Sequence, residues 1–380
     1  MKFIIEKKEL SSLSSLVYRA ASSKNTIPIL SGMLIQVNPT QGLTLTATDM
    51  DIGIVASTQE VEVLTDGQVL VNAHYFNDFI KLLPDGIITI ELNQEASKLS
   101  INYGRSSGFI NIYRDFEYPN LPLEKMEKRM ELPQSILREA LRKTSFAAAF
   151  NHFRPVFTGV LFDFLADHQL RIVASDTHRL AYYAYELKEE QDREPFNFII
   201  PIRTVNELMR VLNEEEENIN ISFGENNVIF HKENFTLLSR LIEGSYPNYR
   251  QVIPLNSSSQ VLINSNAILN ALERAKTMPT DDKLKIQNVQ FKFKENEVLI
   301  NAFSEIMGEL EEFIEEIQID GEKEVNIAFN TNYFLDIAKI MQAECQNMQI
   351  DLSGSIGPAI IKNPEKDNYL YVLVPLRSSN

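Results

Sequence analysis

The side chains that could carry acid–base or metal chemistry are few and lie far apart along the chain. No two of the five histidines stand four residues apart, the spacing at which one face of a helix binds a metal ion. Asp176 and His178 place a carboxylate next to an imidazole, which would suit half of a metal site or a general acid–base pair. Because no second group of ligands accompanies them in the sequence, we expect no metal here.

Nucleophilic catalysis has even less support in the sequence. Ser175, Asp176 and His178 are the residue types of a catalytic triad, but a triad is assembled by the fold and not by adjacency. The chain has no Gly-rich phosphate loop ending in Lys-Ser or Lys-Thr, Cys345 has no base beside it, and Glu214–Glu217 indicates a solvated turn. We therefore expect a protein that is not an enzyme and needs no cofactor. A hydrolase that uses Asp176 and His178 remains the alternative.

The elements that must position these side chains occur three times. Phe76, Phe79, Ile80 and Leu83 have the spacing of one helix face. The same apolar spacing returns 129 residues later and again after another 129, at Val205, Leu208, Met209 and Leu212, and at Phe334, Ile337, Ala338 and Met341. Such a fixed period indicates an internal repeat.

Other features follow nearly the same period. Thr48-Asp49 returns as Ser175-Asp176, and Ile27–Gly32 returns as Arg154–Gly159. A second helix is expected after the first strand of each repeat, with buried stripes at Leu10, Leu13, Val17 and Ala20, at Leu137, Leu141 and Ala148, and at Ile268, Leu272 and Ala275. The sequence predicts an α+β fold of three repeats, in which two helices pack on antiparallel sheets.

The repeats predict three domains, at residues 1–125, 126–254 and 255–380. The Pro-rich stretch Pro119–Pro133 and the Ser-rich stretch Asn256–Gln260 are the expected linkers. The chain has a single cysteine, which predicts a reducing compartment, and Met1–Lys7 lacks the pattern of a signal peptide. With no apolar run of about 18 residues, we expect a soluble, cytoplasmic protein with no membrane contact.

The charge is unevenly distributed along a strongly acidic chain. There are 36 basic and 52 acidic residues, a net charge of −16, whereas proteins that bind DNA through phosphates usually show a basic excess. Basic residues nevertheless recur on the expected helices: Arg138 and Arg142 are four apart, with Lys143 beside them. We interpret these helices as a basic surface that attracts phosphates without reading bases, although ordinary solvated helix faces would look the same.

Several stretches together resemble one family, the bacterial DNA polymerase III beta subunit or replicative sliding clamp. Val173–Ala181 resembles the family's Val-Ala-Thr-Asp-Gly-His-Arg-Leu-Ala, and Arg154–Gly159, Tyr246–Arg250 and Tyr371–Arg377 support the likeness, which covers the whole chain. The resemblance implies a head-to-tail dimeric ring of six domains that encircles duplex DNA, with helices lining the hole. It implies a processivity factor that tethers DNA polymerase III and other polymerases and binds the clamp loader and repair proteins.

The resemblance also implies particular site residues. A pocket for a short partner peptide would be lined by Phe157, Ser175, Thr177, His178, Arg179, Leu180, Pro247, Val252, Val372, Val374, Pro375, Leu376 and Arg377. DNA would meet Lys24, Arg105, Asn151 and Arg203, to which helix position adds Arg138 and Arg142. The dimer interface would pair Arg105, Phe109, Ile110 and Ile112 with Thr277, Met278, Glu309, Glu311 and Glu312 of the other subunit.

Some positions depart from the family pattern. Thr177 stands where the family has Gly, Phe157 is larger than the usual aliphatic residue, and Gln251 replaces a residue that is often basic. The tail Ser378-Ser379-Asn380 runs past the usual end. A repeat scaffold that binds proteins without encircling DNA is the competing interpretation, because it would share the repeats but not the retention on circular DNA.

Overall fold

Two compact units make up the chain, and each is described by itself. Unit 1 comprises Met1–Leu137 and Asn206–Leu241, and unit 2 comprises Arg138–Val205 and Ile242–Asn380. The structure is a computed structural model and describes residues 1–22, 27–93, 95, 97–123, 128–166, 168–187, 195–215, 217–278, 287–304 and 308–376. Within these ranges, no helix is both long enough and apolar enough to cross a membrane.

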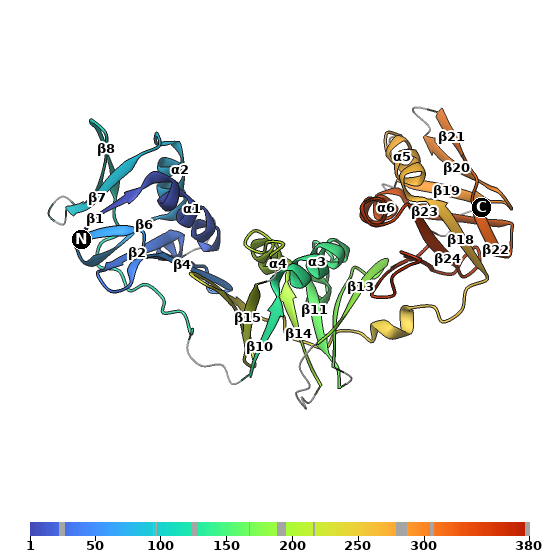
Figure 1. Ribbon diagram of the computed structural model, residues 1–380, viewed down its shortest axis with the longest axis horizontal. Helices are drawn as coiled ribbons and strands as arrows, with labels where there is room; N and C mark the ends of the chain where they lie inside the picture. Colours follow the sequence, from blue (N-terminus) through green and yellow to red (C-terminus); the bar gives the residue numbers. More distant parts are fainter. Residues whose placement is uncertain are drawn as a thin grey trace. The chain divides into compact units, whose positions relative to one another are not determined.

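Unit 1 contains two antiparallel sheets (Figure 1). The first has the strand order β5 (Val61–Thr65), β1 (Lys2–Glu6), β7 (Ile87–Asn93), β8 (Lys98–Tyr103) and β9 (Ser106–Asn111). The second has the order β10 (Lys128–Pro133), β15 (Asn218–Phe223), β16 (Asn227–Lys232), β17 (Phe235–Arg240), β4 (Ile52–Thr58), β3 (Gly42–Thr48), β2 (Gly32–Asn38) and β6 (Gly67–Asn72).

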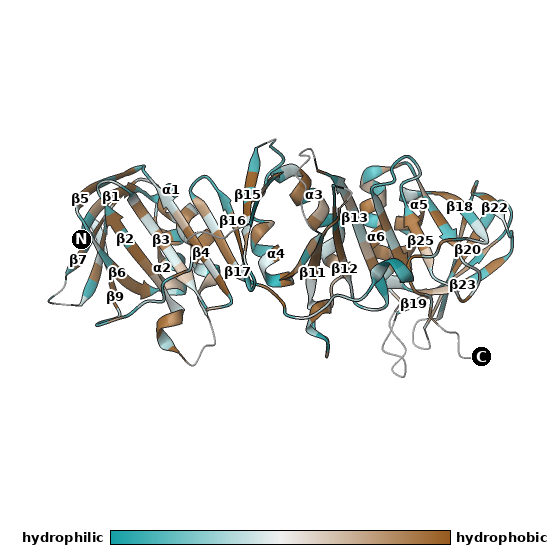
Figure 2. Cartoon of the chain, turned by 90° about the horizontal axis from the view of Figure 1, so that it is seen from below, coloured by the Kyte–Doolittle hydropathy of each residue, from teal (hydrophilic) through white to brown (hydrophobic). Residues whose placement is uncertain are grey.

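Unit 2 also contains two antiparallel sheets. The larger has the order β14 (Phe196–Pro201), β11 (Gly159–Phe164), β12 (Gln169–Ser175), β13 (Arg179–Glu186), β26 (Tyr369–Leu373), β25 (Ala359–Lys362), β24 (Asn347–Leu352), β18 (Ser259–Asn264) and β22 (Gln318–Gly321). The smaller has the order β21 (Gly308–Glu315), β20 (Glu297–Ser304), β19 (Asn288–Phe293) and β23 (Val325–Asn330). Apolar residues run along the strands of both units (Figure 2).

The predicted helices are present, and their apolar stripes are buried except at Phe79, Ala148 and Met209, which are half-buried. The α-helices are α1 (Lys7–Val17), α2 (Ala73–Leu82), α3 (Gln134–Thr144), α4 (Ile202–Leu208), α5 (Ser265–Ala275) and α6 (Thr331–Glu344). Short 3-10 turns are η1 (Tyr18–Ala20), η2 (Pro28–Ser31), η3 (Ser145–Ala147), η4 (Pro155–Thr158) and η5 (Tyr249–Val252). Phe76, Val205 and Phe334, equivalent in the three repeats, are all fully buried. Asn72 and Asn330 cap α2 and α6 by accepting backbone N–H groups.

Each repeat has the same backbone hydrogen bond after its last strand. A backbone N–H just beyond that strand donates to a carbonyl on the strand that precedes the second helix of the repeat, which is β6, β14 or β23. The three bonds are Tyr113 to Leu70 at 2.9 Å, Ile242 to Ile199 at 2.9 Å and Leu376 to Ala328 at 2.8 Å. The three sequence repeats therefore share this hydrogen bond as well as their pattern of buried residues.

The shared Thr/Ser-Asp turn has a structural role in both places. The Thr48 hydroxyl donates to the Ile52 carbonyl at 2.8 Å, and the Ser175 hydroxyl donates to the Arg179 carbonyl at 2.7 Å. Met50 and Thr177, two residues after Thr48 and Ser175, have φ of 81° and 77°. The Ser175 hydroxyl therefore donates its hydrogen bond within its own turn.

Strand pairing connects successive repeats, and we call each such pairing a joint. In unit 1, β4 of the first repeat pairs antiparallel with β17, the last strand of the second. In unit 2, β13 of the second repeat pairs antiparallel with β26, the last strand of the third. Because β4 and β13 occupy the same place in their repeats, as do β17 and β26, the two joints are built alike.

The expected linkers are shorter than predicted. Lys128–Pro133 belongs to β10, and Ser259 and Gln260 begin β18. Pro133 is the last residue of its strand, where a missing N–H costs no central ladder bond, and Ser259 is buried. Pro133 and Ser259 therefore lie at strand ends and not in linkers.

Candidate peptide-binding and nucleic-acid-binding sites

An apolar cluster in unit 2 gathers several residues of the predicted peptide pocket. Leu180 on β13 lies opposite Val372 on β26 in the joint of unit 2. Both are about 3% exposed, and Phe157 is 6% exposed. They pack with Ala149, Val156, Leu161, Val173, Ile199 and Tyr249. Phe157, Leu180 and Val372, which were predicted to line the pocket, therefore belong to one buried apolar cluster, called the apolar base below.

Phe157 fills this base from the side of η4. Its ring meets the His152 ring edge-on at 4.9 Å between centroids and the Tyr246 ring at 5.8 Å. The Arg154 guanidinium lies 5.2 Å from the centroid of the same ring. A bulky aromatic residue is thus accommodated because neighbouring aromatic rings pack around it.

A more exposed rim surrounds the cluster. Thr177 and His178 are exposed in the turn between β12 and β13, and the His178 carbonyl accepts the Val374 N–H at 3.0 Å. Val374 is 43% exposed and Val252 54% exposed, whereas Pro247, Pro375 and Leu376 are half-buried. The rim thus offers apolar groups beside an imidazole. The remaining predicted residue, Arg377, lies outside the described residues.

A cavity of about 550 Å³ lies beside the last described residues of unit 2. Val374, Pro375 and Leu376 form part of its wall, and residues of β19 and β23 form the rest together with Ser355 and Ile356. Ile356 is 89% exposed. The sequence analysis missed these two residues. One signal could have pointed to Ile356. It is the only apolar residue in the turn-forming stretch Ser353–Gly357, and an isoleucine in such a turn has no reason to be there for core packing.

Arg179 points into unit 2 and binds three groups there. Its guanidinium donates to Asp336 at 2.6 Å, to the Phe146 carbonyl at 2.7 Å and to Asp176 at 3.0 Å. It also lies 4.2 Å from the centroid of the Tyr333 ring. Burial opposes its charged form, but nearby Tyr371 and Asp336 outweigh that cost and raise the pKa of Arg179. Asp176 also accepts the His178 N–H at 3.0 Å, so Arg179 supports the turn that carries His178.

The predicted DNA-binding residues are spread over both units. Arg105 lies exposed in the turn between β8 and β9, Asn151 is exposed before η4, and Arg203 is exposed on α4. Arg138 is half-buried on α3, and Arg142 on the same helix pairs with Glu344 at 3.3 Å. Lys24 lies outside the described residues.

Lys143 does not belong to a basic surface, contrary to the sequence analysis. Its side chain is fully buried, with the ammonium 2.6 Å from Glu139 and 2.7 Å from Glu344. The Tyr183 and Tyr369 rings flank it at 5.5 and 5.3 Å. A buried ammonium requires such partners. Glu139 lies one helical turn before Lys143, whereas Glu344, Tyr183 and Tyr369 are far away in the sequence.

The predicted interface residues lie at two sheet edges. Phe109 and Ile110 are on β9, which ends the five-stranded sheet of unit 1, with Arg105 and Ile112 at its two ends. Glu309, Glu311 and Glu312 are on β21, which ends the four-stranded sheet of unit 2, and Thr277 and Met278 follow α5. Phe109 is 63% exposed. Each edge presents unpaired backbone groups among the described strands.

Three family models together account for most of the sequence. The model of the DNA polymerase III beta subunit N-terminal domain matches residues 1–123, the central domain 131–248 and the C-terminal domain 250–377. The chain belongs to the DNA polymerase III beta subunit family.

Relatives agree over the full length. The chain is 32% identical to the beta sliding clamp of Halalkalibacterium halodurans and 30% identical to that of Bacillus subtilis, each covering 100% of both chains. The solved DNA polymerase sliding clamp from Bacillus subtilis superposes with a TM-score of 0.91 at 29% identity, covering 100% of this chain and 99% of that one. The three-repeat α+β clamp fold is thereby confirmed.

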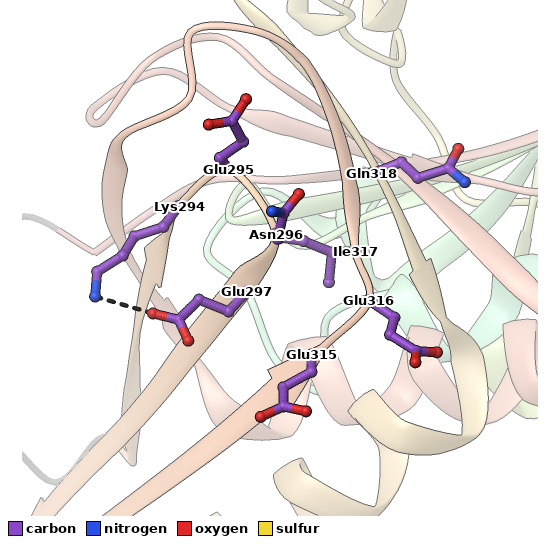
Figure 3. A pocket seen from close by; sticks show the side chains of 8 residues that line it. All are labelled: Lys294, Glu295, Asn296, Glu297, Glu315, Glu316, Ile317 and Gln318. Carbon is purple, nitrogen blue, oxygen red and sulfur yellow. Dashed lines mark hydrogen bonds and ion pairs between the residues drawn. The ribbon is translucent and has the colours of Figure 1, made fainter.

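Groups of side chains that could bind a metal ion were sought among the described residues. In the part of the chain that the structure describes, no three His, Cys, Asp or Glu side chains are placed to hold a metal ion. A cavity of about 710 Å³ near the β19–β20 turn is rich in glutamates, but their carboxylates point in different directions and Glu297 pairs with Lys294 at 3.0 Å (Figure 3). This arrangement does not resemble the coordination shell of a cation.

Proposed function

We propose that this sliding clamp family member acts as a DNA polymerase processivity factor, in which two copies close head to tail into a ring around duplex DNA. The observation that supports it is that the chain forms two joints internally, whereas among the described strands β9 and β21, the two strands that would form a third joint, are unpaired on their outer sides. β9 is a last strand without the partner that β17 and β26 have, and β21 is the equivalent of β4 and β13.

The strand orders favour a second copy as the missing partner. The nine-stranded sheet of unit 2 consists of four strands, β14-β11-β12-β13, followed by five, β26-β25-β24-β18-β22. The two remaining sheets have four strands, β23-β19-β20-β21, and five, β9-β8-β7-β1-β5. If β21 of one copy pairs with β9 of another, the same nine-strand order results. Two such pairings close a ring and leave no open joint.

The acidic net charge suits a ring better than a tight DNA-binding protein. A ring holds DNA by enclosing it, and strong phosphate contacts would hinder sliding. Two helix cations form ion pairs with glutamates: Arg19 with Glu207 at 3.8 Å and Arg142 with Glu344 at 3.3 Å. The proposed DNA contacts are therefore few and independent of sequence, and would come from Lys24, Arg105, Arg138, Arg142, Asn151 and Arg203.

We further assign the cluster at the joint of unit 2 to a peptide-binding pocket. Phe157, Leu180 and Val372 would form its base, and Thr177, His178, Val374 and the neighbouring cavity its rim. An apolar groove with a few polar groups suits a short segment with apolar anchors. One pocket would be shared in turn by DNA polymerase III, other polymerases, the clamp loader and repair proteins, in the cytoplasm. The protein itself would catalyse no reaction.

Retention on DNA tests the proposal. The protein is loaded with a clamp loader and ATP onto nicked circular DNA, and the DNA-bound fraction is isolated by gel filtration. We expect the protein to remain bound to circles at 0.5 M salt and to leave when the circle is cut once. Equal retention on circular and linear DNA would identify a scaffold or a direct DNA-binding protein instead. His178→Ala should weaken partner binding, whereas in a hydrolase it would abolish turnover.

A further inference from the structure

A loop of unit 2 exposes two phenylalanine rings beside the apolar base. The loop comprises residues 150–154, between η3 and η4. Phe150 is fully exposed and Phe153 is 88% exposed, whereas Phe157, four residues further on, is only 6% exposed. Large apolar side chains that are exposed together mark binding surfaces, whereas single ones are common on any protein. The loop is therefore a candidate contact for the ligand of the neighbouring pocket.

The Phe153 ring stacks on His152, which in turn contacts the apolar base. The His152 and Phe153 ring centroids are 4.4 Å apart, with 30° between the ring planes. On its other side the His152 ring meets the Phe157 ring edge-on, with 4.9 Å between centroids. Both contacts are those of packed aromatic pairs. Phe153, His152 and Phe157 thus form a continuous row of rings from the exposed loop to the base, which we call the aromatic row.

Backbone hydrogen bonds hold the loop in this arrangement. The Ala149 N–H donates to the Phe157 carbonyl at 2.8 Å, and the Phe157 N–H donates to the Arg154 carbonyl at 3.2 Å. The Arg154 N–H donates to Nδ1 of His152 at 3.0 Å, which orients the imidazole ring. Because the loop is closed at both ends, the Phe153 ring is presented in place, and binding a ligand there would cost little conformational entropy.

The aromatic row sets how far a bound segment must reach. Phe153 is two ring contacts away from Phe157, and an extended chain advances about 3.3–3.6 Å per residue. A segment with one side chain on the apolar base would therefore bring the side chain two or three residues away to Phe153. His152 covers one face of the Phe153 ring, and the high exposure of that ring leaves its other face open to such a side chain.

We infer that the open face of Phe153 is an additional site for the bound partner segment, and that it takes an aromatic side chain two or three residues from the one seated on the apolar base. The inference rests on the proposed peptide pocket. It goes further by naming a residue that selects among partners. Of two partners with the same apolar motif, the one with an aromatic residue at that distance binds more tightly.

Ring chemistry favours an aromatic occupant over an aliphatic one. Each ring of the aromatic row contacts the next, and a ring from the partner would extend the row with the same kind of contact. Aromatic pairs contribute beyond the apolar area that they bury, enough to change an affinity by roughly two- to tenfold. An aliphatic side chain would gain only the burial of its area.

Charge favours a peptide over single-stranded DNA, whose bases could also stack on phenylalanine. Proteins that bind single strands combine stacking rings with a positively charged groove. Residues 150–153 include no lysine or arginine, and the chain has a net charge of −16. The guanidinium of Arg154, the next residue, lies 5.2 Å from the centroid of the Phe157 ring. The loop therefore offers a DNA backbone little to bind.

Matched peptides test this inference. Fluorescent peptides carry the motif of a glutamine, spaced leucines and a terminal phenylalanine, with either tryptophan or alanine at one variable position. The variable position is moved through the spacers and the flanks of the motif, and polarisation gives the affinity ratio of each tryptophan–alanine pair. We expect one position at which tryptophan binds the unmodified protein about two- to tenfold more tightly. In Phe153→Ala, the ratio at that position should fall to about one.

Phe150→Ala is the matched control. It removes another exposed ring from the same loop, but Phe150 is not part of the aromatic row. The tryptophan–alanine ratio should be unchanged in this variant. An equal fall in Phe150→Ala and Phe153→Ala would assign the effect to the apolar character of the loop and overturn the stacking site.

A labelled oligothymidylate tests the competing ligand with the same three proteins. If Phe153→Ala weakens binding of the oligonucleotide and leaves every peptide ratio unchanged, the ring serves DNA and the inference is wrong.

The alanine peptides separate this inference from the proposed pocket. If no peptide of either kind binds the unmodified protein, the pocket fails and this inference fails with it. If the peptides bind but no ratio depends on Phe153, the pocket stands and only the additional site is rejected.

Discussion

The ammonium group of Lys143 lies 2.7 Å from the carboxylate of Glu344, which joins the end of α3 to the end of α6 inside unit 2. Glu139, which lies one helical turn before Lys143 on α3, binds the same ammonium at 2.6 Å. Lys143 is fully buried, and the Glu344 side chain is only 10% exposed. The ion pair therefore connects the second and third repeats where solvent screening is weak, next to the joint of β13 and β26.

Removing the Glu344 charge should destabilise unit 2. We expect Glu344→Gln to lower the free energy of unfolding by about 2–3 kcal/mol, less than for a buried charge left wholly unpaired, because Glu139 remains. Urea unfolding followed by circular dichroism measures it. Glu243→Gln, an exposed glutamate in the same unit, is the control and should change stability by less than about 0.5 kcal/mol. A similar loss in both variants would contradict the role of the ion pair.

The same cluster predicts a loss of stability in acid. Burial opposes ionisation of Glu139, but hydrogen bonds from Lys143 and Tyr183 outweigh it and lower its pKa. A carboxylate whose pKa is depressed in the folded state stabilises the protein above its unfolded pKa of about 4.3 and loses that contribution as the pH falls through the folded value. Thermal midpoints from pH 7 to 3 should fall less steeply in Glu139→Gln than in the unmodified protein. Parallel curves would disprove the link.

Relief of backbone strain should stabilise the turn between β12 and β13. Thr177 has φ of 77°, a left-handed conformation that a β-branched residue adopts at a cost of roughly 1–2 kcal/mol. We expect Thr177→Gly to raise stability by about 0.5–1 kcal/mol after the greater flexibility of glycine in the unfolded chain is included. Met50→Gly, at the equivalent turn with φ of 81°, should show the same sign in a thermal melt. Destabilisation in both would exclude strain as the dominant effect.

A single charge on the rim should abolish peptide binding. Val374 is 43% exposed, lies two residues beyond Val372 and lines the cavity, so Val374→Glu would bury a carboxylate under any apolar segment bound there. Using a fluorescent peptide with a glutamine, spaced leucines and a terminal phenylalanine, we expect at least a tenfold loss of affinity by polarisation. Leu64→Glu, on β5 of unit 1, should bind normally. Unchanged binding by Val374→Glu would move the pocket elsewhere.

The helices and their buried faces could be predicted from the sequence, because a 3.6-residue apolar period is a local signal. Phe76, Val205 and Phe334 needed no tertiary information to be identified as core residues. The joints could not be predicted in this way. The pairing of Leu180 with Val372 is a property of two distant strands, each of which has the composition of any half-buried strand.

Charged residues were the least predictable. Lys143 has the sequence context of a surface lysine, and only the arrival of Glu344 explains its burial. Arg179 was expected to line the pocket, yet its guanidinium binds Asp336 and the Phe146 carbonyl beneath it. The direction in which a long cationic side chain points depends on partners that a local pattern does not contain, so its role required the structure.

The similarity of the two internal joints to the joint proposed between copies has a mechanical consequence for the ring. The two internal joints are held by the polypeptide as well as by strand pairing, so their partners face each other at an effective concentration set by the chain and rebind at once if they part. The joint formed by β21 and β9 has no such tether, although its hydrogen bonding would be the same. Under a pulling or twisting load, the ring would therefore yield at the boundary between copies, which gives a loading machine a defined gate through which DNA can pass.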